Sequence, residues 1–251
     1  MNDRFVSIVV PAFRAEATIE ATIESVRAQT HQEWEMLIAD DCSPDATRRV
    51  VLQWQQRDPR VRLIALTRNG GPARARNAAL AMASGRWIAF LDSDDLWLPE
   101  KIERSLAHAR ARGAALVFTG YRRISADGTR IGSYISVPAT LSYRQLLGNT
   151  AIATSTVLID RAIVGDFHME ATYYDDFVCW LSILKRGYLA YGLDEDLMRY
   201  RVMPQSVSRN KGRSAQQVWK TYREVEQLGI GPSAWYFCRY AFNALRKYRR
   251  F

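Results

Sequence analysis

Cysteine and histidine are scarce in this chain of 251 residues, which contains three of each. Cys42, Cys179 and Cys238 are widely spaced and form no Cys-x-x-Cys pair, which argues against a disulfide framework and against a cysteine zinc site. We expect each of them to be a small buried or semi-buried residue. The histidines are equally scattered, so no cluster with metal-ligand spacing is present.

Long apolar runs are absent as well. The longest, such as residues 5–10, are far shorter than the roughly 20 residues that span a bilayer. That first run ends at Pro11 with no small-residue cleavage site behind it, so no signal peptide is visible and we expect a cytoplasmic protein. The remaining composition, 48% hydrophobic and 24% charged, is that of a globular chain and excludes disorder, collagen and coiled coil.

Acidic residues almost disappear from the last fifth of the chain. Residues 199–251 contain 12 Lys or Arg against Glu224 and Glu226, whereas residues 1–198 contain 23 Lys or Arg and 24 Asp or Glu. The net charge of +9 therefore resides at the C-terminal end. A basic segment of this kind can bind nucleic acid, bind an anionic membrane surface, or simply form a solvated face. No nucleic-acid-binding motif accompanies the charge, so we expect no nucleic-acid partner.

The basic segment also has a helical pattern, which Pro232 can open. One face collects Phe237, Tyr240, Ala241, Ala244, Leu245, Tyr248 and Phe251, and the opposite side collects Arg239, Arg246, Lys247, Arg249 and Arg250. Two structures share this pattern: an interfacial helix on an anionic membrane, and a terminal helix packed on its own domain. The sequence leaves both open.

The first 121 residues alternate apolar strand-like runs with helix-like segments. Strands are predicted at residues 5–10, 34–39, 61–66, 87–91 and 114–121, and helices at residues 16–29, 45–57, 72–83 and 99–111. Later segments are less regular: a turn at 125–129, strands at 156–160 and 188–192, and helices at 174–186 and 214–228. This order predicts an α/β fold with a mostly parallel sheet covered on both faces and a ligand site at the carboxyl ends of its strands.

Polar residues gather where the predicted strands end. The four groups are Pro11 to Phe13, Asp40 and Asp41, Arg74 and Arg76, and Asp92 to Asp95. Acids beside arginines are costly unless a cation and a polyanion lie between them, and a diphosphate with a divalent metal satisfies both. Asp92-Ser93-Asp94 also places two carboxylates on one side of an extended segment, as hard cations require, although alone it is equally a solvated turn with a helix cap at Asp95.

Four of these segments can be compared with known motifs: Val-Val-Pro-Ala-Phe at 9–13, Ala-Asp-Asp-Cys-Ser at 39–43, Asn-Gly-Gly-Pro-Ala-Arg-Ala-Arg-Asn at 69–77 and Phe-Leu-Asp-Ser-Asp-Asp at 90–95. Together they resemble family 2 of the inverting glycosyltransferases. The resemblance is dense over residues 5–100 and patchier to about residue 210. It implies the GT-A fold, with a Rossmann-like sheet, flanking helices and a mixed acceptor half. We expect this domain at residues 1–210, with a nucleotide half to about residue 95 and an acceptor half over 96–210, and a basic helical extension at 211–251.

The resemblance implies roles for the matching residues. It assigns nucleotide binding to Pro11, Ala12, Phe13, Asp40, Asp41, Arg74, Arg76, Asp92 and Ser93. Within this set the Phe13 ring stacks on uracil, Asp41 accepts a hydrogen bond from the base with Asp40 in support, and Arg76, with Arg74 less directly, faces the base or the diphosphate. Asp94 is the ligand of a Mn²⁺ or Mg²⁺ ion that bridges the diphosphate, and Asp92 holds the ribose or a metal-bound water.

An inverting transfer also needs a base, because a sugar hydroxyl is a poor nucleophile until its proton is taken. The segment from Tyr173 to Trp180 resembles the family's acidic pair at the start of an acceptor-side helix, and Asp176 matches the base position. Asp175 stands where the usual residue is Glu, and an ordinary N-terminal helix cap is the alternative role for this pair. Glu16, Asp95, Asp175 and Trp180 are further expected at the donor or acceptor site.

A last segment resembles the family's Tyr-Arg-x-His sequence and the serine-rich loop after it. The resemblance implies that Arg201 reaches the diphosphate and that Ser206 or Ser208 closes over it. Met203 stands where many relatives have His, and a thioether is a poor ligand for Mn²⁺ or Mg²⁺.

The sequence therefore predicts a metal-dependent inverting glycosyltransferase. We expect a UDP-sugar donor, a growing lipid-linked cell-surface glycan of the polysaccharide or lipopolysaccharide type as acceptor, and a peripheral position on the inner face of the cell membrane. A nucleotidyltransferase normally has a glycine-rich basic loop after the first strand, and a dinucleotide oxidoreductase has G-x-G-x-x-G there; residues 11–16 lack both. A non-catalytic nucleotide- or glycan-binding relative is the remaining alternative, against which the intact Asp94 and Asp176 argue.

Overall fold

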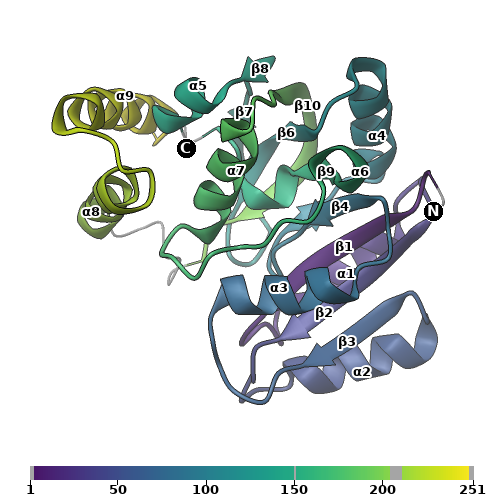
Figure 1. The fold of residues 1–251 in the computed structure, drawn as a ribbon. Helices are drawn as coiled ribbons and strands as arrows, with labels where there is room; N and C mark the ends of the chain where they lie inside the picture. The colour runs from purple at the N-terminus through teal and green to yellow at the C-terminus, as the bar shows by residue number, and fades with distance from the viewer. Residues whose placement is uncertain (1–2, 150, 204–210, 249–251) are drawn as a thin grey trace.

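One twisted sheet runs through the molecule, with helices on both of its faces (Figure 1). The structure is a computed structural model and describes residues 3–149, 151–203 and 211–248. Within that part of the chain the sheet has ten strands, in the order β3-β2-β1-β4-β9-β6-β10-β5, with β7 paired to β6 and β8 paired to β10.

The half predicted to bind the nucleotide, here called the nucleotide half, is built from regular parallel β-α-β units. Its strands are β1 (Val6–Ala12), β2 (Trp34–Asp40), β3 (Val61–Ala65) and β4 (Trp87–Phe90), and its helices are α1 (Ile19–Arg27), α2 (Thr47–Arg57) and α3 (Pro72–Met82). Every pairing among these strands is parallel. Parallel strands covered on both faces are apolar throughout, which is why the sequence predicted them so well.

The half predicted to bind the acceptor, here called the acceptor half, mixes strand directions. Its elements are β5 (Leu96–Trp97), α4 (Lys101–Arg112), β6 (Leu116–Ile124), β7 (Ile131–Ile135), β8 (Thr140–Leu141), α5 (Tyr143–Leu147), the short 3₁₀ turn η1 (Thr154–Thr156), β9 (Leu158–Asp160), α6 (Arg161–Val164), α7 (Asp175–Lys185) and β10 (Ala190–Arg201). β6 and β10 are parallel, but β9 lies antiparallel between β4 and β6. Because β9 runs the other way, the chain just before it lies at the rim where β4 ends.

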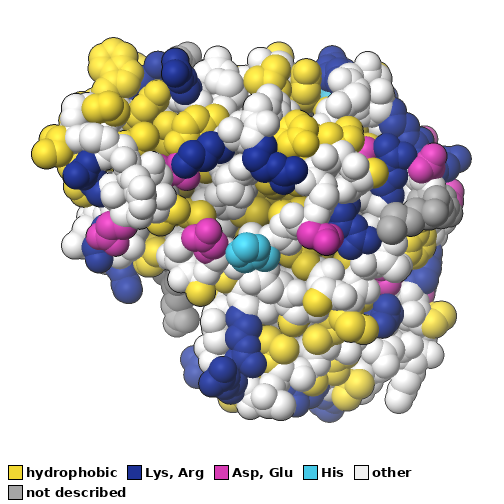
Figure 2. All heavy atoms as spheres, in the orientation of Figure 1, with side chains coloured by type: hydrophobic (Ala, Val, Ile, Leu, Met, Phe, Trp, Pro, Cys, Tyr) yellow, Lys and Arg dark blue, Asp and Glu magenta, His cyan; other side chains and the backbone are white. Residues whose placement is uncertain are grey.

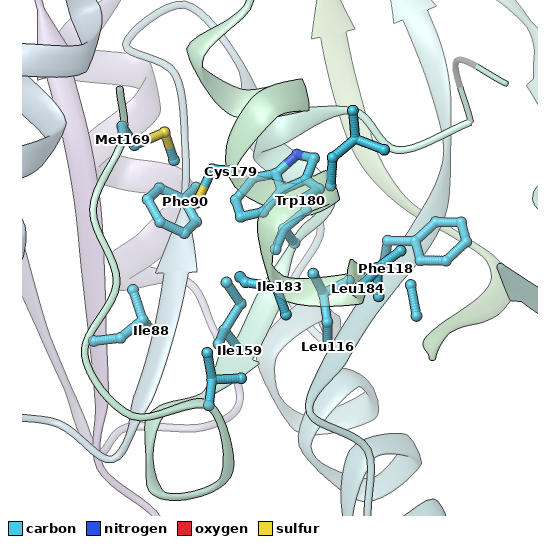
Figure 3. Packing of buried hydrophobic residues seen from close by; sticks show 14 of the residues in the cluster. Ile88, Phe90, Leu116, Phe118, Ile159, Met169, Cys179, Trp180, Ile183 and Leu184 are labelled. Carbon is cyan, nitrogen blue, oxygen red and sulfur yellow. The ribbon is translucent and has the colours of Figure 1, made fainter. Parts of the chain in front are cut away.

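Two hydrophobic clusters fill the space between the sheet and its helices. The helices α1, α2 and α4 contribute to one cluster, and α3 and α7 contribute to the other. Side chains of β1 alternate between the two clusters, with Ile8 in the first and Val9 in the second. Figure 3 shows α7 lying on the sheet, where Trp180 meets Phe90 edge-on at 5.3 Å between ring centroids. Trp180 is 1% exposed, so its indole belongs to the core rather than to the open rim.

Several elements differ from their predicted bounds. The first helix begins at Ile19 rather than at residue 16, and the strand predicted at 188–192 continues to Arg201. Register shifts between Leu193 and Arg199 interrupt the β10 pairing, and the acidic residues there conceal the strand. The predicted turn at 125–129 is confirmed, since it joins the antiparallel strands β6 and β7. Cys42 and Cys238 are exposed, contrary to prediction, while Cys179 is buried.

The C-terminal segment packs against the acceptor half. It consists of α8 (Lys211–Lys220), the π-helical turn η3 (Thr221–Val225) and α9 (Ile230–Tyr248), where the sequence predicted one helix over 214–228 and a second opened by Pro232. The aromatic rings of Phe237 and Tyr240 pack on the same cluster as α7. Of the two alternatives, a membrane-bound face and a face packed on the domain, this aromatic face of α9 is therefore the packed one. None of the described helices is long and apolar enough to cross a bilayer.

Candidate active site

The end of β2 organises the loop that opens α3. The carboxylate of Asp41 accepts hydrogen bonds from the backbone N–H groups of Gly70 at 2.9 Å and Gly71 at 2.7 Å. Asp40 is fully buried and accepts from Arg48 at 2.8 Å. Asp41, the acid predicted to bind the base, thus holds the glycine loop in place, while Asp40 pairs with Arg48 of α2.

The predicted base-stacking residue lies open at the rim. The Phe13 side chain follows β1 and is 43% exposed, with the Arg14 guanidinium 5.2 Å from the ring centroid. An exposed aromatic ring beside a cation is suited to stack on a planar base. Pro11 is half-buried and Ala12 is buried in the strand end behind it.

The buried carboxylate of Asp95 stabilises the turn that follows β4. Asp95 is 1% exposed, and its carboxylate accepts from the backbone N–H of Arg201 at 2.9 Å and from Ser155 Oγ at 2.5 Å. The Arg201 guanidinium donates to the backbone oxygens of Asp94 at 2.8 Å and of Ala126 at 2.9 Å. Asp95 and Arg201 therefore hold the turn, and in this structure the guanidinium of Arg201 is engaged with backbone rather than aimed at open space.

Asp92 and Asp94 fit a divalent cation. Burial, together with the charge of Asp92, raises the pKa of Asp94 to about 6. A cation bound between these two carboxylates would offset their mutual repulsion and the cost of burying Asp94. Among the described residues no group of three or more His, Cys, Asp or Glu forms a complete ligand set. Two carboxylates that leave the remaining positions to phosphate and water suit Mg²⁺ or Mn²⁺.

Arg76 joins the two halves of the site. Its Nη2 donates to Asp92 Oδ1 at 2.6 Å, and its Nη1 donates to Asp175 Oδ2 at 2.7 Å. Burial lowers the pKa of Arg76, but the charges of Asp92 and Asp175 outweigh it and keep the pKa above its ordinary value. Burial also raises the pKa of Asp175, which the pairing with Arg76 opposes. The guanidinium predicted to face a base or diphosphate is thus occupied by two carboxylates.

Asp176 lies at the start of α7, next to that network. Its Oδ1 accepts from the backbone N–H of Phe177 at 2.7 Å, and its Oδ2 accepts from Thr154 Oγ1 at 2.5 Å. The residue is partly exposed, whereas its neighbour Asp175 is buried. A carboxylate held at both oxygens yet open to solvent is suited to take a proton from a bound hydroxyl.

Sequence reasoning missed Thr154 and Ser155. Both belong to η1, which precedes the antiparallel strand β9 and so reaches the rim from the opposite direction to the motif loops. Ser155 Oγ accepts from the backbone N–H of Asp92 at 3.0 Å and donates to Asp95. The stretch around residue 150 has no periodicity, so the available signal was a run of three hydroxyl residues, 154–156, before a strand.

The remaining predicted residues are more peripheral. Arg74 Nη1 donates to the backbone oxygen of Arg68 at 3.1 Å, and the Glu16 carboxylate accepts from the backbone N–H of Ala46 at 2.8 Å. The backbone oxygen of Ser93 accepts from Thr18 and Thr22 of the α1 region. Ser206 and Ser208 lie outside the described residues.

Comparison with known sequences gives a consistent assignment. Residues 7–165 match the family described as "Glycosyl transferase family 2". The chain is 43% identical over 243 residues to "Putative teichuronic acid biosynthesis glycosyltransferase TuaG" of Bacillus subtilis, an alignment that covers 96% of each chain. It is 34% identical over 249 residues to "UDP-Glc:alpha-D-GlcNAc-diphosphoundecaprenol beta-1,3-glucosyltransferase WfgD" of Escherichia coli, covering 99% of this chain and 96% of the relative.

Solved structures share the fold at low sequence identity. TarS 1-349 of S. aureus, crystallised with UDP-GlcNAc, is 17% identical with a TM-score of 0.70, and the match covers 94% of this chain and 71% of TarS. The mannosyltransferase PcManGT from Pyrobaculum calidifontis, in complex with GDP-Man and Mn²⁺, is 18% identical with a TM-score of 0.70, covering 95% of this chain and 73% of that protein. The predicted α/β architecture is confirmed by these neighbours.

Proposed function

Because the chain belongs to glycosyl transferase family 2 and is a glycosyltransferase, we propose that it inverts the anomeric centre of a UDP-sugar with the help of a divalent metal. The observation that carries the proposal is the ion-pair network of Arg76, which brings Asp92 beside Asp175 and hence beside the base candidate Asp176. An inverting transfer needs a charge-neutralised leaving diphosphate and a proton acceptor at one place.

In the proposed reaction Asp176 is the general base. It takes the proton of the acceptor hydroxyl while that oxygen forms a bond to C1 of the donor sugar, on the face opposite the diphosphate. The bond between C1 and the diphosphate oxygen breaks, and its electron pair leaves with UDP. Asp94 and Asp92 would hold a Mn²⁺ or Mg²⁺ ion, which would supply Lewis-acid neutralisation of the charge on the diphosphate. The hydrogen bonds from Thr154 and Phe177 keep the Asp176 carboxylate in place.

The names of the relatives support the substrate classes. The E. coli relative is named for UDP-Glc and a diphosphoundecaprenol acceptor, and the B. subtilis relative for teichuronic acid. We accordingly propose a lipid-linked intermediate of a cell-surface glycan as the acceptor. The open ring of Phe13 supports a planar base on the donor side.

Calorimetric titration with UDP, GDP and TDP, each with and without Mn²⁺, tests the donor side. Metal-dependent binding of UDP alone is the expected result. A preference for GDP or TDP would change the donor and keep the chemistry. A folded sample that binds none of the three nucleotides would overturn the proposal.

The base assignment is tested by Asp176→Asn. This variant should bind UDP and Mn²⁺ as the parent does and lose transfer by about 10²- to 10⁴-fold, the typical contribution of a general base. Asp166→Asn is a matched control, because Asp166 is an exposed acid in the loop before α7. Retained transfer in Asp176→Asn would remove Asp176 from the proposed mechanism. Determining the anomeric configuration of the product separates inversion from retention.

We also propose that the enzyme works at an anionic membrane surface and that α9 contacts it through the face turned away from the domain. Trp235 and Phe242, seven residues apart on one side of α9, are 64% and 66% exposed, and the exposed Arg239 lies between them in the chain. In Figure 2 hydrophobic side chains gather at the upper left, over α9, with Lys and Arg side chains beside them. Exposed aromatics with a cationic flank suit an interfacial helix. The aromatic face predicted to do this, with Phe237 and Tyr240, is packed instead.

Cosedimentation with phosphatidylglycerol and phosphatidylcholine vesicles tests this contact. The parent should bind the anionic vesicles, and the double variant Trp235→Ala/Phe242→Ala should lose most of that binding. Ile131→Ala is the control, since Ile131 is 61% exposed on the distant strand β7. Unchanged binding by the double variant, or dimerisation that the double variant abolishes, would contradict a membrane role for this face.

A further inference from the structure

The turn η1 contacts both chemical centres of the site through two adjacent hydroxyl groups. Thr154 Oγ1 donates to Asp176 Oδ2 at 2.5 Å, while Ser155 Oγ bonds to the backbone N–H of Asp92 at 3.0 Å and to Asp95 at 2.5 Å. Thr154 is 7% exposed and Ser155 is 1% exposed. One peptide unit thus separates the contact to the proposed base from the contact to the proposed metal turn.

The turn itself is firmly held. The backbone oxygen of Ser155 accepts from Trp97 Nε1 at 2.7 Å, and the buried Thr156 closes the turn by donating to Ala153 O at 2.5 Å. Val157, the next residue, accepts from the backbone N–H of Phe90 at the end of β4. A turn tied to β4, to β5 and to its own backbone is held against the strand that leads into Asp92.

We propose that Thr154 and Ser155 are positioning residues that fix the distance between the proton acceptor and the leaving diphosphate. Thr154 orients Asp176, and Ser155 orients the Asp92–Asp95 turn. Each hydroxyl donates its proton to a carboxylate, Ser155 to Asp95 and Thr154 to Asp176, and both side chains are buried, so we assign them a role through these carboxylates rather than direct contact with the substrate. This inference rests on the proposed roles of Asp176 and Asp94.

The two hydroxyls predict different kinetic defects. Thr154→Val has nearly the shape of threonine, so it removes the hydrogen bond with little change in packing. It should lower kcat by about tenfold to a hundredfold, the cost of a misplaced catalytic group, and leave the UDP–Mn²⁺ affinity unchanged. Thr154→Ser keeps the hydroxyl and should restore kcat to within about threefold of the parent. Ser155→Ala should instead weaken metal-dependent UDP binding, because it loosens the turn with Asp92.

Thr221→Val is the matched control. It makes the same change at a buried threonine of η3, whose hydroxyl donates to the backbone oxygen of Gln217 in the C-terminal segment, and should leave kcat within about twofold of the parent while it lowers Tm. A kcat of Thr154→Val equal to that of the parent, or equal losses of UDP affinity in Thr154→Val and Ser155→Ala, would overturn the proposal. Asp176→Asn, measured alongside, separates the two levels of inference: if it retains transfer, the base assignment has failed, and if it abolishes transfer while Thr154→Val is neutral, only the positioning role has failed.

Discussion

Arg76 and Asp175 form a buried ion pair, 2.7 Å between Nη1 and Oδ2, across 99 residues of sequence. The same guanidinium binds Asp92, so one side chain links the turn after β4 to the start of α7. Two carboxylates that share one planar cation are held at a fixed spacing, which a flexible ammonium does not achieve.

Arg76→Lys should therefore be far from conservative. A single ammonium cannot bridge Asp92 and Asp175 with two parallel donors, and a buried carboxylate left unpaired is costly. We expect kcat/KM to fall by about 100-fold and Tm to fall by several degrees, measured by steady-state kinetics and thermal unfolding. Arg104→Lys is the control, because Arg104 pairs with Glu195 at the surface, where such pairs contribute little. Similar losses in both variants would contradict the bridging role.

Gly71 sits at the entrance of α3 with a φ of +85° and no atom within 4 Å of the place that a Cβ would occupy. Alanine there is strained by its backbone alone, so Gly71→Ala should lower the free energy of unfolding by about 1–3 kcal/mol. Gly231→Ala makes the same change in equally open space within α9, without a positive φ, and should be neutral or stabilising by up to about 1 kcal/mol. Denaturant titration of both variants measures the difference. Equal effects would mean that the backbone conformation of Gly71 is not what makes glycine necessary.

Lys101 is buried against Trp97, with its Nζ 3.9 Å from the ring centroid and without a hydrogen-bond partner in the part of the chain that the structure describes. Burial lowers its pKa from 10.5 to about 7. Below pH 7 the ammonium is charged in both folded and unfolded chains, and the penalty of burying it is complete. As the pH rises from 7 toward 10.5, only the unfolded chain still holds the proton, so this penalty is progressively relieved.

Lys101→Met should therefore raise Tm most at pH 6 and progressively less toward pH 10. Thermal unfolding at several pH values measures the difference between variant and parent at each pH. Lys220→Met, an exposed lysine on α8, should show no such trend. A gain in Lys101→Met that does not depend on pH would indicate that Lys101 keeps its ordinary pKa in the folded chain.

The sequence predicted most of the nucleotide half because its information is local. Each strand is an apolar run, and each motif follows a strand end, so Asp41 and Asp94 were placed at the rim without any knowledge of contacts. The partner of Arg76 was out of reach, because no local pattern joins residue 76 to residue 175. Thr154 and Ser155 were missed because they precede an antiparallel strand, whereas the recognisable motifs follow parallel ones. In α9 the periodicity predicted the helix. It did not show whether the domain covers the face with Phe237 or the face with Trp235.

The long separation between Arg76 and Asp175 also bears on how the protein folds. Residues 6–95 can assemble from contacts between neighbouring β-α-β units, and such local contacts form quickly. The Arg76 bridge closes a loop that contains β4, β6 and β9, so it carries a larger entropic cost and belongs to a later stage. In a refolding experiment, nucleotide-binding structure should therefore return before catalytic activity, and activity would report completion of the whole sheet.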